Sequence, residues 1–339
     1  MSEAAEPSVA RLVEVVRKHL LIEPTSITEV GELSNINYVY RVATSERDFY
    51  LKVVPEQPKR LPIKLPRERV FSEAEGLRRY RAYAGDDLIV PEVLFVDGEE
   101  MALAMSDVGD GRQILFNVLA DEFHLLSEQG ESIGRALGRI HAATRGRGTP
   151  RPAQEEFIIR KVVFDGLLAP GARQVFPELW DAVSAEMQGN DECLIHADLW
   201  SKNLLVAEGQ PIAVVDFEGI LYGDPAFDLG TLTAVALVPA IDRPQSMPAA
   251  LDFIARLTDT WTTHCGDADW ARAVIPRAFR ATATFLAARG FGPFSYAMSD
   301  GARQQLKALA HSLAASPPND FAAFRDRVLF HTTEQQKAS

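Results

Sequence analysis

The sequence predicts an α+β protein of two lobes, a small lobe built on an antiparallel sheet and a larger, mainly helical lobe. Two observations predict this fold class: strand-like alternation dominates the chain up to residue 105, and helical periodicity dominates after it. We place the small lobe at residues 1–105, a linker at residues 106–111 and the helical lobe at residues 112–339. A chain of 339 residues is long enough for two such units.

The small lobe is expected to contain two helices and two hairpins. Residues 8–20 carry apolar side chains at helical spacing, and so do residues 67–83. Between these helices, the stretches VYRVATS and FYLKVV alternate as two strands around a short polar turn. The stretch VPEVLFVDGEEMALAM then predicts a second hairpin, which turns at Asp97–Gly98.

The larger lobe is predicted to be helical, with two short strands set among the helices. The stretch SIGRALGRIHA has its apolar residues at helical spacing. The apolar stretches CLI and IAVVDF are predicted to be buried strands. Helices resume at Asp228 and persist to about Phe330.

Charge and composition argue against several classes of protein. The formal net charge is −12, whereas a general nucleic-acid binder would need a basic face. The N-terminus lacks the pattern of a signal peptide, and no apolar run reaches the ~18 residues of a membrane span. We therefore expect a cytoplasmic protein without a nucleic-acid or membrane partner. Its two cysteines, Cys193 and Cys265, are expected to be reduced, buried thiols.

The strongest chemical signal is the stretch HADLWSKN, which is followed by the strand that ends at Asp216. Phosphoryl transfer needs an oriented nucleophile and neutralised phosphate charge more than covalent help from the protein. Asp198 can accept a hydrogen bond from an attacking hydroxyl group. Asn203 and Asp216 offer the hard oxygen ligands that Mg²⁺ prefers. The spacing therefore predicts Asp198 as the catalytic base and Asn203 and Asp216 as metal ligands.

These residues resemble the catalytic loop and metal site of the family of aminoglycoside phosphotransferases, choline kinases and methylthioribose kinases, which is similar to protein kinases in fold. The family's loop reads H-G-D-x-x-x-x-N, and this chain has H-A-D-L-W-S-K-N. The resemblance implies a bilobal protein-kinase-like fold, ATP and Mg²⁺ as cofactors, and a small-molecule hydroxyl acceptor. Ala197 replaces the family's glycine, a change that should be tolerated if its backbone is not at positive φ.

The resemblance also assigns the lysine in FYLKVV. Lys52 shares its side of the predicted strand with apolar residues, where a charged group needs a partner. In the family a strand lysine contacts the α- and β-phosphates and pairs with a glutamate on the following helix. Glu73 is the match, because Glu75 lies almost on the opposite face of that helix. We count Lys52 with Asp198 and Asn203 as catalytic.

Further nucleotide contacts follow from the likeness of the first lobe to methylthioribose kinases. The stretch GELSNINYVYRV resembles the family's phosphate-covering hairpin, in which Ser34, Asn35 and Asn37 would offer donors to phosphate oxygens. An ordinary polar turn is the alternative. The family's hinge, which binds adenine through its backbone, corresponds to Met105, Ser106, Asp107 and Val108.

Two residues are expected to support the loop. His196 should orient the loop backbone and not act as a base. Asp228, in YGDPAFDLG, should brace the loop, and a helix N-cap role is compatible with that. Trp200 either stacks on a substrate ring or covers the loop.

Three charged residues are candidates for contact with the acceptor: Glu218, Arg277 and Arg280. Methylthioribose kinases lack the loop asparagine and use an adjacent arginine pair in a late helix. This chain has Asn203, and its late arginines are three residues apart. Arg277 and Arg280 either face the acceptor from one side of a helix or are solvated or ion-paired on the surface.

The sequence therefore predicts an ATP-dependent, magnesium-requiring phosphotransferase that acts on an alcohol group. A sugar-like acceptor such as methylthioribose ranks first, and an aminoglycoside or an amino alcohol ranks second. A catalytically inactive nucleotide-binding module is the alternative from another class. Against it, the set Lys52, Asp198, Asn203 and Asp216 is intact. A homodimer is compatible with the sequence.

Overall fold

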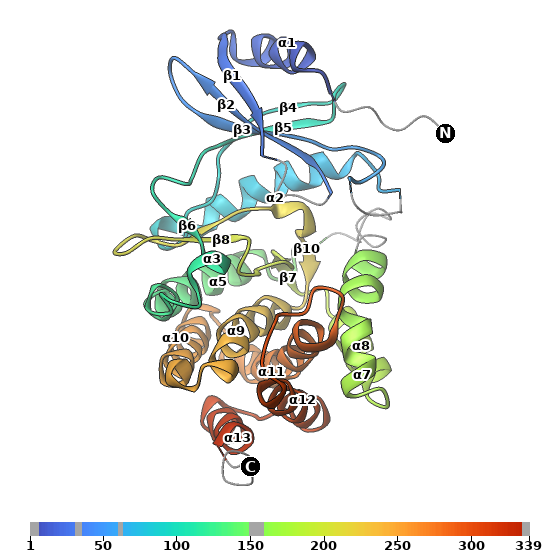
Figure 1. Ribbon diagram of the computed structural model, residues 1–339, viewed down its shortest axis with the longest axis vertical. Helices are drawn as coiled ribbons and strands as arrows, with labels where there is room; N and C mark the ends of the chain where they lie inside the picture. The colour runs from blue at the N-terminus through green and yellow to red at the C-terminus, as the bar shows by residue number, and fades with distance from the viewer. Residues whose placement is uncertain (1–6, 31–35, 60–63, 149–158, 334–339) are drawn as a thin grey trace. The chain divides into compact units, whose positions relative to one another are not determined.

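The computed structural model describes four stretches of the chain: residues 7–30, 36–59, 64–148 and 159–333. The chain divides into two units: Met1–Ala82 with Val90–Asp110, and Tyr83–Ile89 with Gly111–Ser339. The first unit is built around one antiparallel sheet, and the second is mainly helical (Figure 1).

The first unit contains a five-stranded sheet in the order β1-β2-β3-β5-β4, in which every neighbouring pair is antiparallel. Its elements in chain order are α1 (Val9–Leu20), β1 (Pro24–Glu29), β2 (Tyr38–Thr44), β3 (Phe49–Val53), α2 (Arg69–Ala84), β4 (Val93–Asp97) and β5 (Ala102–Ser106). Both predicted hairpins, β2–β3 and β4–β5, are confirmed, as are the two predicted helices.

Strand alternation decides which side chains each face of this sheet presents. Leu51 and Val53 of β3 point to the face on which α1 packs, where they join a core cluster with Leu12 and Val16 of that helix. Lys52 points to the other face, where its ammonium group contacts Glu73 of α2. The periodicity of two thus separates the apolar core from the one buried lysine of this strand.

The strand β1 was not predicted from the sequence. It is the edge strand beside β2, and four of its six residues are exposed. The segment PTSITE therefore lacks the apolar alternation that marks a half-buried strand. Backbone pairing with Tyr40, Val42 and their neighbours, which the sequence does not reveal, defines it as a strand.

The second unit holds two small antiparallel sheets, β10-β7 and β6-β8-β9, among its helices. Its first elements are η1 (Gly85–Asp87), β6 (Gln113–Ile114), α3 (Leu115–Val118), α4 (His124–Ser127), α5 (Gly130–Thr144), η2 (Ile159–Leu168), α7 (Ala169–Val175) and α8 (Trp180–Gln188). The catalytic-loop region follows with β7 (Cys193–Ile195), β8 (Leu204–Val206), β9 (Ala213–Val214), η3 (Phe217–Gly219) and β10 (Leu221–Gly223). The last elements are α9 (Pro225–Asp242), η4 (Pro244–Ser246), α10 (Met247–His264), α11 (Ala268–Phe291), α12 (Asp300–Ala315) and α13 (Phe321–Thr333).

The helix α9 is the core helix of the second unit. Among the described residues it alone has the length and hydropathy of a membrane span, although 89% of that apolar stretch is buried inside the protein. A buried core helix has the same composition as a span, so this burial accounts for its apolar sequence. The two cysteines, Cys193 and Cys265, are both free and buried, as predicted.

Close packing of α5 against α10 depends on glycine. A Cβ atom at Gly134 would lie 2.6 Å from the carbonyl oxygen of Leu257, and one at Gly130 would lie 2.7 Å from that of Phe253. Real Cβ atoms do not approach oxygen so closely, so these positions exclude any side chain. The short helix separation brings His141 of α5 to Trp261 of α10, a contact that matters for the catalytic loop.

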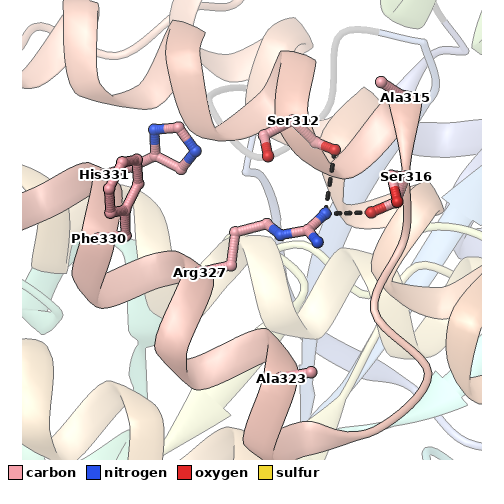
Figure 2. A pocket seen from close by; sticks show the side chains of 7 residues that line it. All are labelled: Ser312, Ala315, Ser316, Ala323, Arg327, Phe330 and His331. Carbon is pink, nitrogen blue, oxygen red and sulfur yellow. Dashed lines mark hydrogen bonds between the residues drawn. The ribbon is translucent and has the colours of Figure 1, made fainter.

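A pocket of about 430 Å³ lies between α12 and α13 (Figure 2). Arg327, which lines this pocket, donates to the carbonyl oxygens of Ser312, at 3.3 Å, and Ser316. These carbonyls belong to the C-terminal end of α12, where the Ser312 carbonyl also accepts from the Ser316 amide at 3.1 Å. Arg327 therefore caps a helix, and its hydrogen bonds are used within the pocket wall.

Candidate active site

The first unit holds the predicted lysine–glutamate pair. Lys52 Nζ donates to Glu73 Oε1 at 2.9 Å, and the two residues are only 4% and 1% exposed. Glu75 instead lies on the exposed side of α2, where it pairs with Arg79 at 2.8 Å. The predicted choice of Glu73 over Glu75 is confirmed as a contact. Leaving either charge of such a buried pair without its partner costs about 3–5 kcal/mol.

The other predicted nucleotide contacts of the first unit are described in part. Ser34 and Asn35 lie outside the described residues. Asn37 is buried, and its Oδ1 accepts a hydrogen bond from Arg69 Nη2 at 2.9 Å. Part of its hydrogen-bonding capacity therefore stabilises the protein itself.

The predicted hinge continues from the end of β5. Met105 and Ser106 are the last two residues of that strand, and the Ser106 amide donates to the Glu92 carbonyl at 2.9 Å. Asp107 Oδ1 accepts from the Gly109 amide at 2.7 Å, which fixes a turn that includes Val108. An adenine-binding role for these residues stays a prediction.

In the second unit, a hairpin brings two of the predicted chemical residues to one end. Asn203 directly precedes Leu204, the first residue of β8, and Asp216 lies two residues after Val214, the last residue of β9. Leu204 and Val214 are paired across the hairpin. The Val215 amide then donates to the Asn203 carbonyl at 3.0 Å. Antiparallel pairing therefore places Asn203 and Asp216 at the same end of the hairpin.

The Asn203 side chain holds the predicted base. Its Nδ2 donates to Asp198 Oδ2 at 2.7 Å and to the Asp198 carbonyl at 2.9 Å. Both amide hydrogens are thereby used on Asp198, which fixes the orientation of the amide group. Those two hydrogen bonds do not use Asn203 Oδ1, and a carboxamide oxygen is a ligand that Mg²⁺ accepts.

Three carboxylates make this end of the hairpin strongly negative. Burial raises the pKa of Asp198 to about 7, the charges of Asp216 and Glu218 add to the rise, and Arg289 and Asn203 oppose it. A divalent cation would relieve the repulsion among these carboxylates. Within the described residues, no three His, Cys, Asp or Glu side chains form a metal cluster. Magnesium bound to a nucleotide needs only one or two protein carboxylates, so the residues present fit it.

The raised pKa of Asp198 predicts a pH-dependent effect on stability. The neutral carboxyl favours the folded state, and this stability is present below the usual value of 3.8 and lost as the pH rises through about 7. Asp198→Asn, which stays neutral at all pH values, should therefore have a higher free energy of unfolding than wild type. We expect this difference between variant and wild type to be larger at about pH 8 than at about pH 5, by about 1–2 kcal/mol. Urea unfolding of the metal-free protein at both pH values measures this difference. Asp259→Asn, at an exposed site on α10, is the control and should show no such increase.

A buried carboxylate holds the backbone of the catalytic loop. Asp228 in α9 accepts hydrogen bonds from the amides of His196 and Ala197, both at 2.9 Å. The N-cap of α9 is Asp224, whose side chain accepts from the Ala226 amide, so the N-cap role considered for Asp228 is wrong. These two hydrogen bonds are consistent with the predicted role of Asp228 in bracing the loop.

Two residues that the sequence analysis missed support this brace. Trp261 Nε1 donates to His141 Nδ1 at 3.0 Å, which leaves the proton of a neutral His141 on Nε2. That nitrogen lies 3.5 Å from Asp228 Oδ2. The chain of contacts runs from α10 through α5 to α9, and it depends on a helix packing that the sequence does not reveal.

His196 is held inside the protein. It is fully buried, its ring packs on Phe217 with 4.4 Å between ring centroids, and burial lowers its pKa. The imidazole is therefore neutral near pH 7, and its amide is bound by Asp228. This geometry supports the predicted role in orienting the loop.

The backbone at Ala197 contradicts the condition under which its substitution for glycine was expected to be tolerated. Its φ is 63°, in the left-handed region. An L-residue there is disfavoured because its Cβ crowds the following carbonyl oxygen, at a cost of roughly 1–2 kcal/mol. Asp216, with a φ of 63°, shares this conformation. Ala197 directly precedes the predicted base and Asp216 is a predicted metal ligand, and strained conformations are concentrated at such sites.

Ala197→Gly should accordingly stabilise the protein. Removing the Cβ relieves the left-handed strain, and the greater freedom of glycine in the unfolded chain offsets part of the gain, so we expect about 0.5–1 kcal/mol. Urea unfolding with an unchanged slope measures it. Ala185→Gly, on the exposed side of α8, is the matched control and should destabilise by about 1 kcal/mol. If Ala197→Gly and Ala185→Gly lowered the free energy of unfolding by the same amount, residue 197 would not be strained in wild type.

Trp200 is buried under a cation that the sequence analysis did not select. The Arg289 guanidinium lies 3.7 Å from the centroid of the Trp200 ring, and Tyr296 packs on the same ring at 5.7 Å. The Trp200 amide donates to the Asp198 carbonyl at 2.8 Å, so this cluster adjoins the base. Arg289 lies in the apolar stretch FLAARGF, and this lone charge on a buried helix is the signal that could have found it.

Arg277 and Arg280 both form ion pairs. Arg277 pairs with Glu192 at 2.7 Å and with Asp224 at 2.9 Å, and Arg280 pairs with Glu186 at 2.9 Å. Arg277 thus ties α11 to the N-cap of α9. These contacts favour the ion-paired interpretation of both arginines over contact with an acceptor.

The chain resembles known phosphotransferases in sequence. The model of a family described as the phosphotransferase enzyme family matches residues 29–273. A 4-hydroxytryptamine kinase from Psilocybe cyanescens is 30% identical over 165 residues, which are 42% of this chain and 45% of that protein. A methylthioribose kinase from Bacillus cereus (strain B4264) is 25% identical over 273 residues, 69% of this chain and 65% of that protein. The chain thus spans less than two thirds of the length of either relative.

Solved structures share the fold. A microcompartment-associated aminopropanol kinase has a TM-score of 0.53 at 17% identity, covering 90% of this chain and 95% of that one. A choline kinase from Streptococcus pneumoniae has a TM-score of 0.50 at 15% identity, covering 90% and 97%. At such identities the likeness concerns the fold alone. It confirms the predicted α+β, protein-kinase-like fold class.

Proposed function

The chain belongs to the phosphotransferase enzyme family, and we propose that it transfers the γ-phosphoryl group of ATP to a hydroxyl group of a small molecule. One observation carries the proposal: Asn203 holds the carboxylate of Asp198 at 2.7 Å, beside the charges of Asp216 and Glu218. Transfer of a phosphoryl group to an alcohol requires a base held in position next to carboxylates that can bind a metal cation.

Each residue of the second unit has a distinct task in the proposed reaction. Asp198 accepts the hydrogen bond of the acceptor hydroxyl, orients its oxygen and takes its proton as the bond to the γ-phosphorus forms. At the same time the bond from that phosphorus to the β,γ-bridging oxygen breaks, and ADP leaves. Asp216 and Asn203 Oδ1 would hold Mg²⁺, and Glu218 is a further candidate ligand because its charge acts on the same cluster. The metal, when bound, neutralises the phosphate charge that would otherwise repel the attacking oxygen. Asp228 keeps the loop backbone in place.

In the first unit, we assign Lys52 to the phosphates that stay on the nucleotide. The contact with Glu73 fixes the position of its ammonium group, so the charge is already oriented before the nucleotide binds. The backbone of Met105 to Val108 is assigned to adenine on the strength of the family resemblance. ATP is therefore the proposed phosphoryl donor.

A sugar-like acceptor similar to methylthioribose remains the first candidate. It is supported by the match to a methylthioribose kinase over 69% of this chain, which is the longer of the two sequence matches above. Amino alcohols and aminoglycosides are the second candidates, and the aminopropanol kinase and choline kinase share only the fold with this chain.

A coupled assay of ADP release tests this proposal across pentoses including methylthioribose, amino alcohols, aminoglycosides and hydroxyindoles. We expect magnesium-dependent release of ADP that needs one acceptor class and exceeds the rate with water alone. Binding of Mg-ATP without turnover on any acceptor would instead support a catalytically inactive nucleotide-binding module.

A further inference from the structure

Arg289 is a buried cation whose charge is not neutralised by an ion pair. Its side chain belongs to the last turns of α11, and the residue is 8% exposed. Within the described stretches, no carboxylate lies within 4.0 Å of its guanidinium, and its Nε donates no hydrogen bond. Its Nη1 reaches the Phe294 carbonyl only at 3.5 Å. Arg277 and Arg280, which lie earlier on the same helix, each pair with a carboxylate instead.

The contact with Trp200 does not make up for the missing anion. A cation over an aromatic face is stabilised by the ring, but less than a buried guanidinium loses when it leaves water. The charge still felt by Arg289 is that of Asp198, which opposes the lowering of its pKa by burial. Arg289 is therefore held near the proposed base without forming an ion pair with it.

The surroundings of Arg289 suit an anionic oxygen group and not an ammonium group. Tyr296 packs on the same Trp200 ring as Arg289, and its hydroxyl group shares a hydrogen bond of 3.0 Å with Ser201 Oγ. A guanidinium offers paired donors that match a carboxylate or a phosphoryl group. The Trp200 face that could hold an ammonium group is already covered by Arg289.

We infer that Arg289 binds an oxyanion, a carboxylate or phosphoryl group, next to Asp198. The inference deepens the proposed function and rests on it for the identity of the anion. Two sources share this chemistry: an acidic group on the acceptor, and the phosphoryl group in transfer. In either case, a cationic group of an acceptor is excluded from this position.

Calorimetric titration with inorganic phosphate tests the inference without turnover. The full-length protein saturated with Mg-ADP should bind phosphate at one site, and Arg289→Gln should weaken that binding at least about tenfold. Arg289→Lys keeps the charge but not the planar fork, so it should weaken binding less. Arg280→Gln, on the same helix and paired with Glu186, is the matched control and should leave the phosphate Kd within about twofold.

A second arm identifies the source of the anion. Mg-AMP-PNP replaces Mg-ADP, so that a γ-phosphoryl group is already present. Phosphate binding that persists and still depends on Arg289 assigns the site to an acidic group of the acceptor, whereas loss of binding assigns it to the phosphoryl group in transfer. The inference is overturned if Arg289→Gln and Arg289→Lys bind phosphate as wild type does, or if the folded wild-type protein binds none. Because these titrations need no acceptor, their failure is distinguishable from a failed ADP-release assay.

Discussion

Asp198→Asn is expected to lower kcat by about 10²–10⁴-fold while the Kd for Mg-ATP changes little. The asparagine keeps the shape of the side chain and can still receive the hydrogen bond from Asn203, which in wild type spans 2.7 Å. It cannot take the proton of the acceptor hydroxyl, so the loss falls on the transfer step and not on nucleotide binding. Steady-state kinetics with the acceptor found by ADP release, together with calorimetry of Mg-ATP, measures both quantities.

A second Asp→Asn variant serves as the control for Asp198→Asn. Asp259→Asn removes an exposed carboxylate from α10 and should leave kcat unchanged. If Asp198→Asn turned over near the wild-type rate, Asp198 would not be the base. If it lost nucleotide binding in parallel with turnover, its role would lie in holding the loop or the metal instead.

Asp216→Ala is expected to abolish the magnesium dependence of nucleotide binding. Asp216 lies beside Asn203 at the end of the β8–β9 hairpin, and its charge contributes to the rise in the pKa of Asp198. Without this carboxylate, Mg²⁺ loses a ligand with a formal charge, and we expect the affinity for Mg-ATP to fall at least about tenfold. Calorimetric titrations of ATP with and without Mg²⁺ should then give similar, weak binding.

The far end of the same hairpin supplies the control for this variant. Glu208 is an exposed carboxylate in the turn between β8 and β9. Glu208→Ala should bind ATP with the magnesium dependence of wild type. Unchanged magnesium dependence in Asp216→Ala would reject Asp216 as a metal ligand.

The spacing of Asp198, Asn203 and Asp216 was sufficient to predict their grouping, because each follows or precedes a short apolar strand. The ends of paired strands are fixed by backbone hydrogen bonds, so a sequence that marks the strands also indicates where their flanking residues meet. The pair of Lys52 with Glu73 was predictable for a related reason. A lysine among apolar strand residues needs a partner, and helical geometry allows only one of the two nearby glutamates.

Features that depend on tertiary packing were not predictable from the sequence. The left-handed backbone at Ala197 occurs in a loop whose amides bind Asp228, 31 residues later in the chain. The support by His141 and Trp261 depends on the close approach of α5 and α10. The edge strand β1 has too few buried residues to show alternation, and backbone pairing alone defines it.

Arginines on α11 show the same limit. Arg277, Arg280 and Arg289 belong to one helix, and sequence periodicity alone does not tell which of them meets a carboxylate. The structure gives ion pairs to the first two and leaves Arg289 beside Trp200. The sequence singled out the two spaced arginines, whereas the third, Arg289, is the one whose charge acts on Asp198.

In the function proposed above, Asp198 directs a phosphoryl group from ATP to a hydroxyl group. Transfer of label from γ-radiolabelled ATP to a pooled set of sugars, amino alcohols and aminoglycosides, with and without Mg²⁺, tests it most directly. We expect a labelled acceptor product that requires Mg²⁺ and that Asp198→Asn forms at a rate lower by orders of magnitude. A labelled product formed by Asp198→Asn at the wild-type rate, or no labelled product from any acceptor class, would contradict it.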